Sequence, residues 1–275
     1  MKKWQLLIFA VLLFSACGQA GSKDNGDGSE LWHENYFIQT SVDASRLSEN
    51  VIRARVDGQW QNFDLVEFPE IFFSWDFNRR IETIEDISKG VMPGLAGPHN
   101  GIVATYGYRR ADSQFKLNNA VKGCGFLPKR EKLKEVIELL KSTYNNEFSE
   151  KIDVLIGFYE QGDSLFDMTK QVSLELYSVP ERNTQSFLNQ MSNPVSVIVF
   201  LDIPTFKLKT ISYLLHPENP DLTDYEKDVV EYVNLIHSYF HGEFSKEFIT
   251  VVYNVVEVYN SSPGNDNGRG TKISP

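Results

Sequence analysis

Cysteine is scarce in this sequence, and its scarcity excludes one class of fold. The 275 residues include only Cys17 and Cys124. Two cysteines cannot build the disulfide framework that supports many small secreted domains. Cys124 is flanked by glycines, and no activating base lies near it in the sequence. We therefore interpret it as a small buried residue near a turn rather than as a nucleophile.

Catalytic and metal-binding motifs are missing as well. The sequence contains neither a Gly-x-Ser-x-Gly elbow nor a phosphate-binding loop ending in Gly-Lys-Ser/Thr. His237 and His241 are four residues apart, but Ser238 stands where the zinc-protease pattern needs Glu. The motifs therefore predict no catalytic residue, no metal site and no cofactor.

Positive charge and long apolar runs are also in short supply. The chain has 27 Lys and Arg against 37 Asp and Glu, a formal net charge of −10. Such an acidic protein is a poor ligand for nucleic acid, so we predict no nucleic-acid partner. The apolar run at residues 4–14 is too short for a membrane-spanning helix, which needs about 20 residues. We interpret this run as a targeting segment.

The first 18 residues carry the clearest motif. Lys2 and Lys3 precede the apolar run, and Ser15 and Ala16 stand directly before Cys17. This order resembles the signal peptide and lipobox of bacterial lipoproteins, although Phe14 replaces the more usual leucine. The resemblance implies cleavage after residue 16 and acylation of Cys17, with palmitate among the acyl groups. It implies a partner as well, the membrane, which the protein would contact through this lipid.

The resemblance also predicts where the protein works. A glycine rather than an aspartate follows Cys17, which by Gram-negative sorting rules implies the outer membrane, on its periplasmic face or at the surface. Cleavage would remove two lysines and leave 25 basic against 37 acidic residues, about −12. An anionic lipid surface repels such a body, so acyl chains would have to hold it. Residues 17–30 lack large apolar side chains and are predicted to form a flexible tether.

Residues 31–100 are predicted to form a β-rich N-terminal region. We expect strands at residues 36–42, 51–56, 59–66 and 70–75, and a short helix at 81–91. Asp57-Gly58 separates two alternating runs, which is a strong signal for a two-residue hairpin turn. The many aromatic residues of this region favour a sheet core over an exposed sugar-binding surface.

A loop and two arginines are the candidate binding residues. Residues 90–101 are rich in Gly and Pro, which place His99 and Asn100 on a loop, where function often lies. The alternative is a plain connector between subdomains. Arg109 and Arg110 form an adjacent pair that could bind an anion, although such a pair also suits the rim of a turn.

Residues 101–260 are predicted to repeat one β-β-α-β unit. The first unit covers about 101–160, with strands at 102–108, 114–121 and 152–159 and a helix that begins at Pro128. The second covers about 195–260, with strands at 195–202, 206–214 and 248–259 and a helix that begins at the capping box Thr223–Glu226. The helix of the first unit matches that of the second at an offset of 96 residues. Residues 169–178 and a short helix near 184–191 join the units.

The predicted fold class is α+β, with a mainly antiparallel sheet and helices on one face. Residues 261–275 are polar and are predicted to be a disordered tail. The functional hypothesis is a membrane-anchored, noncatalytic lipoprotein that binds a protein, a glycan or a small molecule at the cell envelope. The alternative is an envelope hydrolase with its site around residues 90–101.

Overall fold

The computed structural model describes residues 28–275. The predicted signal peptide, Cys17 and most of the predicted tether lie outside these residues. The described chain begins with a short 3-10 helix, η1 (Ser29–Leu31). No helix in this part of the chain is long and apolar enough to cross a membrane.

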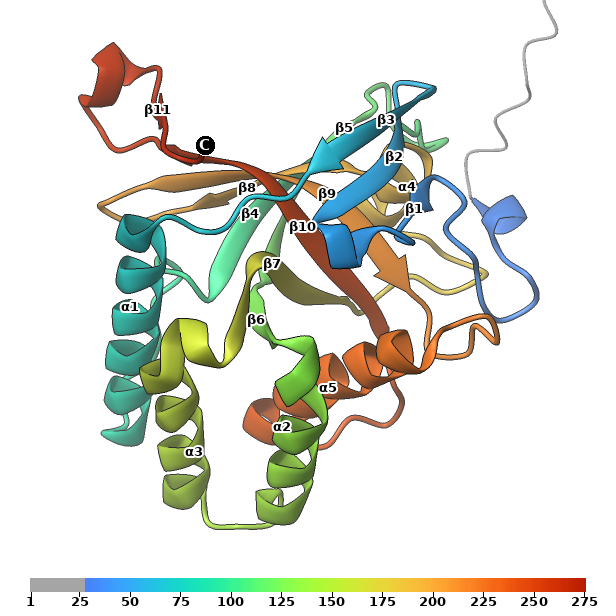
Figure 1. Cartoon of the computed structure of the whole chain (residues 1–275). Helices are drawn as coiled ribbons and strands as arrows, with labels where there is room; N and C mark the ends of the chain where they lie inside the picture. The colour runs from blue at the N-terminus through green and yellow to red at the C-terminus, as the bar shows by residue number, and fades with distance from the viewer. Residues whose placement is uncertain (1–27) are drawn as a thin grey trace, which may run out of the picture.

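One large antiparallel sheet organises the protein (Figure 1). Its strand order is β5-β4-β8-β9-β10-β7-β6, and β11 pairs with β10 beside this path. The strands are β4 (Asn100–Tyr106), β5 (Leu117–Gly123), β6 (Gly125–Pro128), β7 (Phe166–Glu175), β8 (Val195–Phe200), β9 (Phe206–Leu215), β10 (Ile249–Asn260) and β11 (Thr271–Lys272). Only Cys124 separates β5 from β6, so the two ends of the path meet. The sheet is therefore curled on itself.

A smaller sheet covers the outer face of the large one. It consists of β1 (Val42–Asp43), β2 (Val51–Val56) and β3 (Gln59–Asp64), in that order. Asp57 and Gly58 have φ values of 48° and 81°, which the predicted two-residue turn requires. Ile52 and Ala54 of β2 are fully buried in one cluster with Ile211 of β9. The small sheet is thus fixed to the large one by apolar contact.

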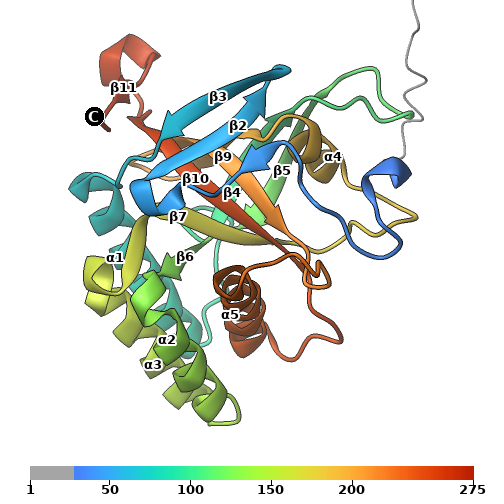
Figure 2. The same ribbon diagram turned by 45° about the vertical axis from the view of Figure 1, so that its right-hand side comes forward.

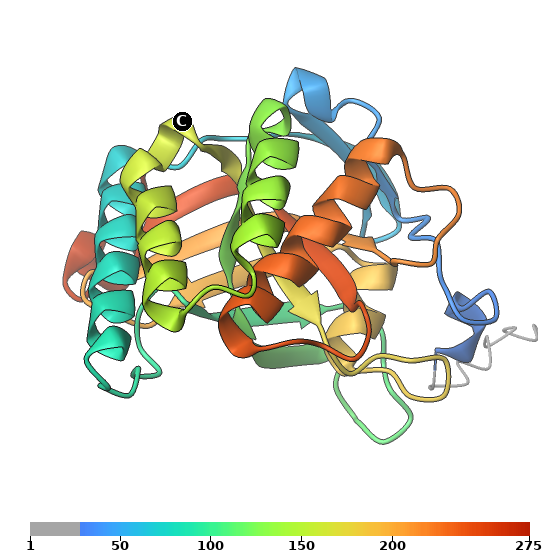
Figure 3. The ribbon, with the colours of Figure 1, turned by 90° about the horizontal axis from the view of Figure 1, so that it is seen from below.

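Four of the five described α-helices gather on one side of the large sheet (Figure 3). They are α1 (Glu70–Ser88), α2 (Arg130–Thr143), α3 (Phe148–Gln161) and α5 (Asp224–His241). The fifth, α4 (Gln185–Ser192), packs instead against β4, β5 and β9. The predicted α+β class with an antiparallel sheet is confirmed.

The two predicted units differ in their strand pairing. In the second, β8 pairs with β9 and β9 with β10, whereas the first contains only the pairing of β4 with β5, because β6 pairs with β7, which begins beyond residue 160. The two helices of the units meet where Thr143 Oγ1 lies 2.8 Å from the Tyr239 hydroxyl, and these residues are 96 positions apart. The capping box of α5 is formed as predicted. The first unit also ends in α3 rather than in the predicted strand at 152–159.

Several segments have a different secondary structure from the one predicted. Residues 70–75 and 81–91 were expected as a strand and a short helix, but most of both segments lies in the single helix α1. Residues 152–159 were expected as a strand and lie in α3. Of residues 36–42, only Val42 lies in a strand, and Tyr36 makes one isolated bridge. Pro128 ends β6 rather than opening α2.

Both ends of the described chain are more ordered than predicted. The tether was expected to reach residue 30, but Glu30 already accepts a hydrogen bond from the Tyr108 hydroxyl at 2.9 Å. The tail was expected to be disordered, but it contains η4 (Asn265–Gly268) and β11. The Ser274 hydroxyl accepts a hydrogen bond from the Val258 amide at 3.1 Å, which holds the tail against β10.

Candidate functional site

The four predicted binding residues do not form one site. His99 and Asn100 lie at the start of β4, whereas Arg109 and Arg110 follow its other end. The seven residues of β4 span roughly 20 Å at the usual rise per residue. The two pairs must therefore be considered separately.

His99 is half-buried and lies beside a fully buried arginine. Arg80 of α1 is 1% exposed, and its Nη1 lies 3.4 Å from His99 Nδ1. Arg80 also donates to the Pro98 carbonyl at 2.8 Å and forms an ion pair with Asp76. Its guanidinium carbon lies 5.4 Å from the centre of the Phe126 ring. These contacts attach the loop to α1, so the loop has a structural role.

The same surroundings fix the charge of His99. Burial and the neighbouring Arg80 charge lower the pKa of His99 to about 3. The imidazole is therefore neutral at physiological pH, and its Nε2 is shielded from solvent. Asn100 is half-buried, with its amide 3.5 Å from the Leu95 carbonyl. A general base for an outside substrate needs more access than His99 has.

The arginine pair lies on the connection between β4 and β5. Arg109 is exposed, and Arg110 binds the Asp112 carboxylate through two hydrogen bonds of 2.6 and 2.7 Å. Arg110 also lines a groove that runs beside β5. Of the four predicted residues, Arg110 alone lines this groove.

The groove follows the free edge of β5. This strand pairs with β4 and with no other described strand. The amides of Gly107 and Cys124 donate to Lys116 and His99 at either end of the β4–β5 pair. Because hydrogen-bonded residues alternate along an antiparallel strand, the backbones of Leu117, Asn119 and Val121 face away from β4.

The opposite wall of the groove is the segment between β7 and α4. It includes Tyr177, Arg182 and Thr184, and the groove encloses about 580 Å³. Tyr177 is 62% exposed. An unpaired strand edge thus faces a polar wall across an open space.

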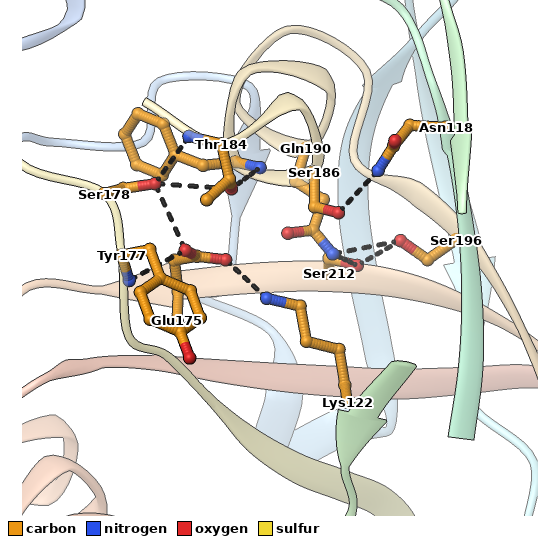
Figure 4. A network of polar contacts seen from close by, with 11 residues as sticks. Asn118, Lys122, Glu175, Tyr177, Ser178, Thr184, Ser186, Gln190, Ser196 and Ser212 are labelled. Carbon is orange, nitrogen blue, oxygen red and sulfur yellow. Dashed lines mark hydrogen bonds and ion pairs between the residues drawn. The ribbon is translucent and has the colours of Figure 1, made fainter. Parts of the chain in front are cut away.

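A hydrogen-bonded network holds Lys122, one of the residues that line the groove (Figure 4). The Lys122 ammonium of β5 lies 2.6 Å from the Glu175 carboxylate of β7, and the Glu175 side chain is 1% exposed. The Tyr177 amide and the Ser178 hydroxyl also donate to Glu175. A buried carboxylate is unfavourable unless an opposite charge and hydrogen bonds replace its lost contacts with water. This network therefore fixes the distance between β5 and β7.

A second set of bonds fixes α4 beneath the groove. Asn118 of β5 donates to Ser186 at 3.0 Å, and the Thr184 hydroxyl caps the helix at the Phe187 amide. Deeper in the sheet, Gln190 reaches Ser196 and Ser212, each at 3.2 Å (Figure 4). Both walls of the groove are therefore held in place, and a partner would meet a preformed surface.

Another cavity, of about 610 Å³, lies near the start of α5. Several of its polar residues already have partners: Tyr213 donates to Glu226 at 2.6 Å, and Lys170 pairs with Asp167, which is outside the lining. Its one lining residue from an edge strand is Leu127 of β6, which is only four residues long, whereas five consecutive residues of β5 line the other groove. The β5 groove is therefore the stronger candidate.

Neither reactive cysteine chemistry nor metal binding is apparent elsewhere in residues 28–275. Cys124 is 4% exposed, and burial raises the pKa of its thiol to about 12. His237 is half-buried, and its Nδ1 lies 2.7 Å from the Val233 carbonyl of its own helix. No group of three His, Cys, Asp or Glu among the described residues is arranged to hold a metal ion.

Sequence reasoning missed the residues that build the groove. Lys122 and Glu175 are 53 residues apart, and Asn118 and Ser186 are 68 apart. One signal was available in and just after the strand predicted at 114–121. Its alternate positions Asn118, Ala120 and Lys122 share one face, and two of the three are polar where a buried face would be apolar. The sequence does not reveal that this strand has a free edge.

Comparison with known proteins gives no match: no protein-family model fits the sequence, and no curated protein matches it. The function has to be argued from the geometry of the site.

Proposed function

We propose that this protein is a lipid-anchored envelope protein that binds a polypeptide partner along the free edge of β5 and performs no catalysis. The lipid anchor rests on the signal-peptide motif that ends at Cys17. The binding mode rests on one observation, the unpaired edge of β5 beside a preformed groove. An extended peptide that adds to a strand edge satisfies exactly such backbone groups.

The edge favours a polypeptide over a glycan or a small molecule. Leu117, Asn119 and Val121 each present one amide and one carbonyl, so a partner strand could form up to about six hydrogen bonds with them. These residues occupy every second position of β5, and an added peptide strand presents its own amides and carbonyls at the same interval. Lys122 lines the groove but is already bonded to Glu175, so its ammonium is not a free hydrogen-bond donor for a glycan or a small molecule. Main-chain hydrogen bonds would then supply affinity. The side chains at the opening of the groove, which we call its rim, would supply selectivity.

The rim suggests the character of the partner. Arg110 and Arg182 lie on opposite walls of the groove in a chain of net charge −10. Tyr177 adds an exposed ring to the same lining. A segment with acidic and apolar side chains on alternate positions would suit this rim.

An Asn119→Pro variant tests the binding mode. The Asn119 amide faces the open edge, so proline removes a donor for the partner without removing a bond to β4. The matched control is Asn119→Ala, which keeps the amide. We expect crosslinked capture of the partner from native membranes to fall about tenfold with proline and to stay unchanged with alanine. Equal capture by both variants would refute edge pairing.

The anchor has its own test. The Cys17→Ala variant should be released from membranes, because no acyl chain could then be attached. If it still sediments with membranes after a high-salt wash, the lipoprotein hypothesis is wrong.

A further inference from the structure

The connection between β4 and β5 exposes a concentrated group of apolar and basic side chains. Tyr106, Phe115 and Leu117 are 51%, 71% and 65% exposed. Residues 107–116 between the strands carry Arg109, Arg110, Lys116 and a single acid, Asp112, a net charge of +2 within a chain of −10. Exposed rings that are flanked by cations are the composition of a surface that enters the headgroup region of a bilayer.

The start of the described chain lies beside this hairpin. Glu30 bonds to Tyr108, which belongs to the hairpin, and Gly28 lies against α4. A Cβ at Gly28 would come within 2.2 Å of the Leu188 side chain, and the φ of 75° there also favours glycine. Figure 2 shows η1 near the β4–β5 connection.

The position of the chain start limits where a membrane can lie. Ten residues lie between Cys17 and Gly28, and even a fully extended chain spans at most about 40 Å over these eleven steps. An acyl group on Cys17 would therefore hold this end of the molecule close to the lipid. A surface tethered so closely has a high effective concentration at the bilayer, so weak contacts suffice.

We infer that the β4–β5 hairpin is a second membrane contact, with Tyr106, Phe115 and Leu117 in the headgroup region and Arg109 and Lys116 at lipid phosphates. This inference rests on the proposed lipid anchor. Aromatic rings prefer this interfacial zone, and arginine and lysine bind phosphate oxygens. The two contacts would orient the molecule, with the β5 groove opening close to the membrane surface.

The test places one environment-sensitive fluorophore on the full-length acylated protein. The thiol of a Phe115→Cys variant carries the dye, and the matched control is Phe148→Cys at the start of α3. Phe148 is also exposed, at 47%, and α3 lies at the far end of the molecule from the hairpin (Figure 1). Cys124 should not react, because it is 4% exposed. Each protein is reconstituted into phosphatidylethanolamine vesicles that contain phosphatidylglycerol and nitroxide-labelled lipid.

We expect the nitroxide lipid to quench the dye at position 115 at least about twofold and to leave the dye at position 148 unchanged. Equal quenching, or none, at both positions would overturn the membrane contact. A blue-shifted but unquenched dye at position 115 would overturn it as well, because the hairpin would then be buried against a second copy of the protein. If the protein does not remain on the vesicles at all, the lipid anchor itself has failed, and this outcome is separate from the others.

Discussion

Replacing Lys122 by methionine tests whether the ion pair beneath the groove holds β5 against β7. Methionine keeps most of the side-chain length but removes the charge that lies 2.6 Å from the Glu175 carboxylate. Glu175 would remain almost fully buried, with donors only from the Tyr177 amide and the Ser178 hydroxyl. Removing one member of a buried ion pair typically costs 3–5 kcal/mol, and the two remaining donors favour the lower end, about 3 kcal/mol. For a domain of this size, the midpoint of thermal unfolding should fall by about 6–12 °C.

The matched control is the double variant Lys122→Met with Glu175→Gln. The glutamine can still accept the bonds from Tyr177 and Ser178 but carries no charge. We therefore expect it to recover at least about half of the lost free energy of unfolding, measured by urea denaturation. If Lys122→Met alone changes the free energy of unfolding by less than about 1 kcal/mol, the pair does not support the groove.

Two further predictions concern the interior near α1. Because burial and Arg80 lower the pKa of His99 to about 3, the unfolded chain binds a proton below pH 6.5 that the folded protein does not bind. Between pH 7 and 5.5 this histidine should therefore cost the wild type about 1.2 kcal/mol of stability, a loss that a His99→Gln variant should not show in urea titrations. Identical pH dependence of the two proteins would contradict the burial of His99. The thiol of Cys124 should react with a maleimide only after unfolding, and mass spectrometry showing rapid labelling of the native protein would contradict its position.

The parts of the fold that could be predicted are those with local signals. Asp57-Gly58 fixes a hairpin because both positions have positive φ, and Thr223 and Glu226 form a capping box across three residues. The strand β10 was recognisable from its nearly continuous apolar run. In each case, the residues that determine the element lie within it.

The helix α1 was missed because an ion pair interrupts its apolar face. Its buried residues include Phe72, Phe77 and Ile84, but Asp76 and Arg80 lie on the same face, where charged residues hide the helical period. Residues 152–156 are mostly β-branched or aliphatic and therefore suggested a strand. The spacing of three between Ile152, Leu155 and Phe158, all buried, shows the helix α3 instead.

The candidate site could not be predicted, for a different reason. Its walls come from β5 and from the segment that runs from the end of β7 into α4, which are brought together only when the sheet curls on itself. The free edge of β5 is a property of strand order, and strand order depends on contacts between residues that are far apart in the sequence. Of the predicted binding residues, only Arg110 lines this groove.

A photo-crosslinking amino acid at position 119 would test edge pairing most directly. The probe would sit on the exposed side of β5, and a second protein with the probe at Leu139 of α2, which is 42% exposed, would serve as the control. In native membranes, we predict that position 119 crosslinks to an extended segment of one partner polypeptide and that position 139 does not. If position 119 gives no polypeptide adduct, or if both positions give the same adducts, the β5 edge is not the binding site.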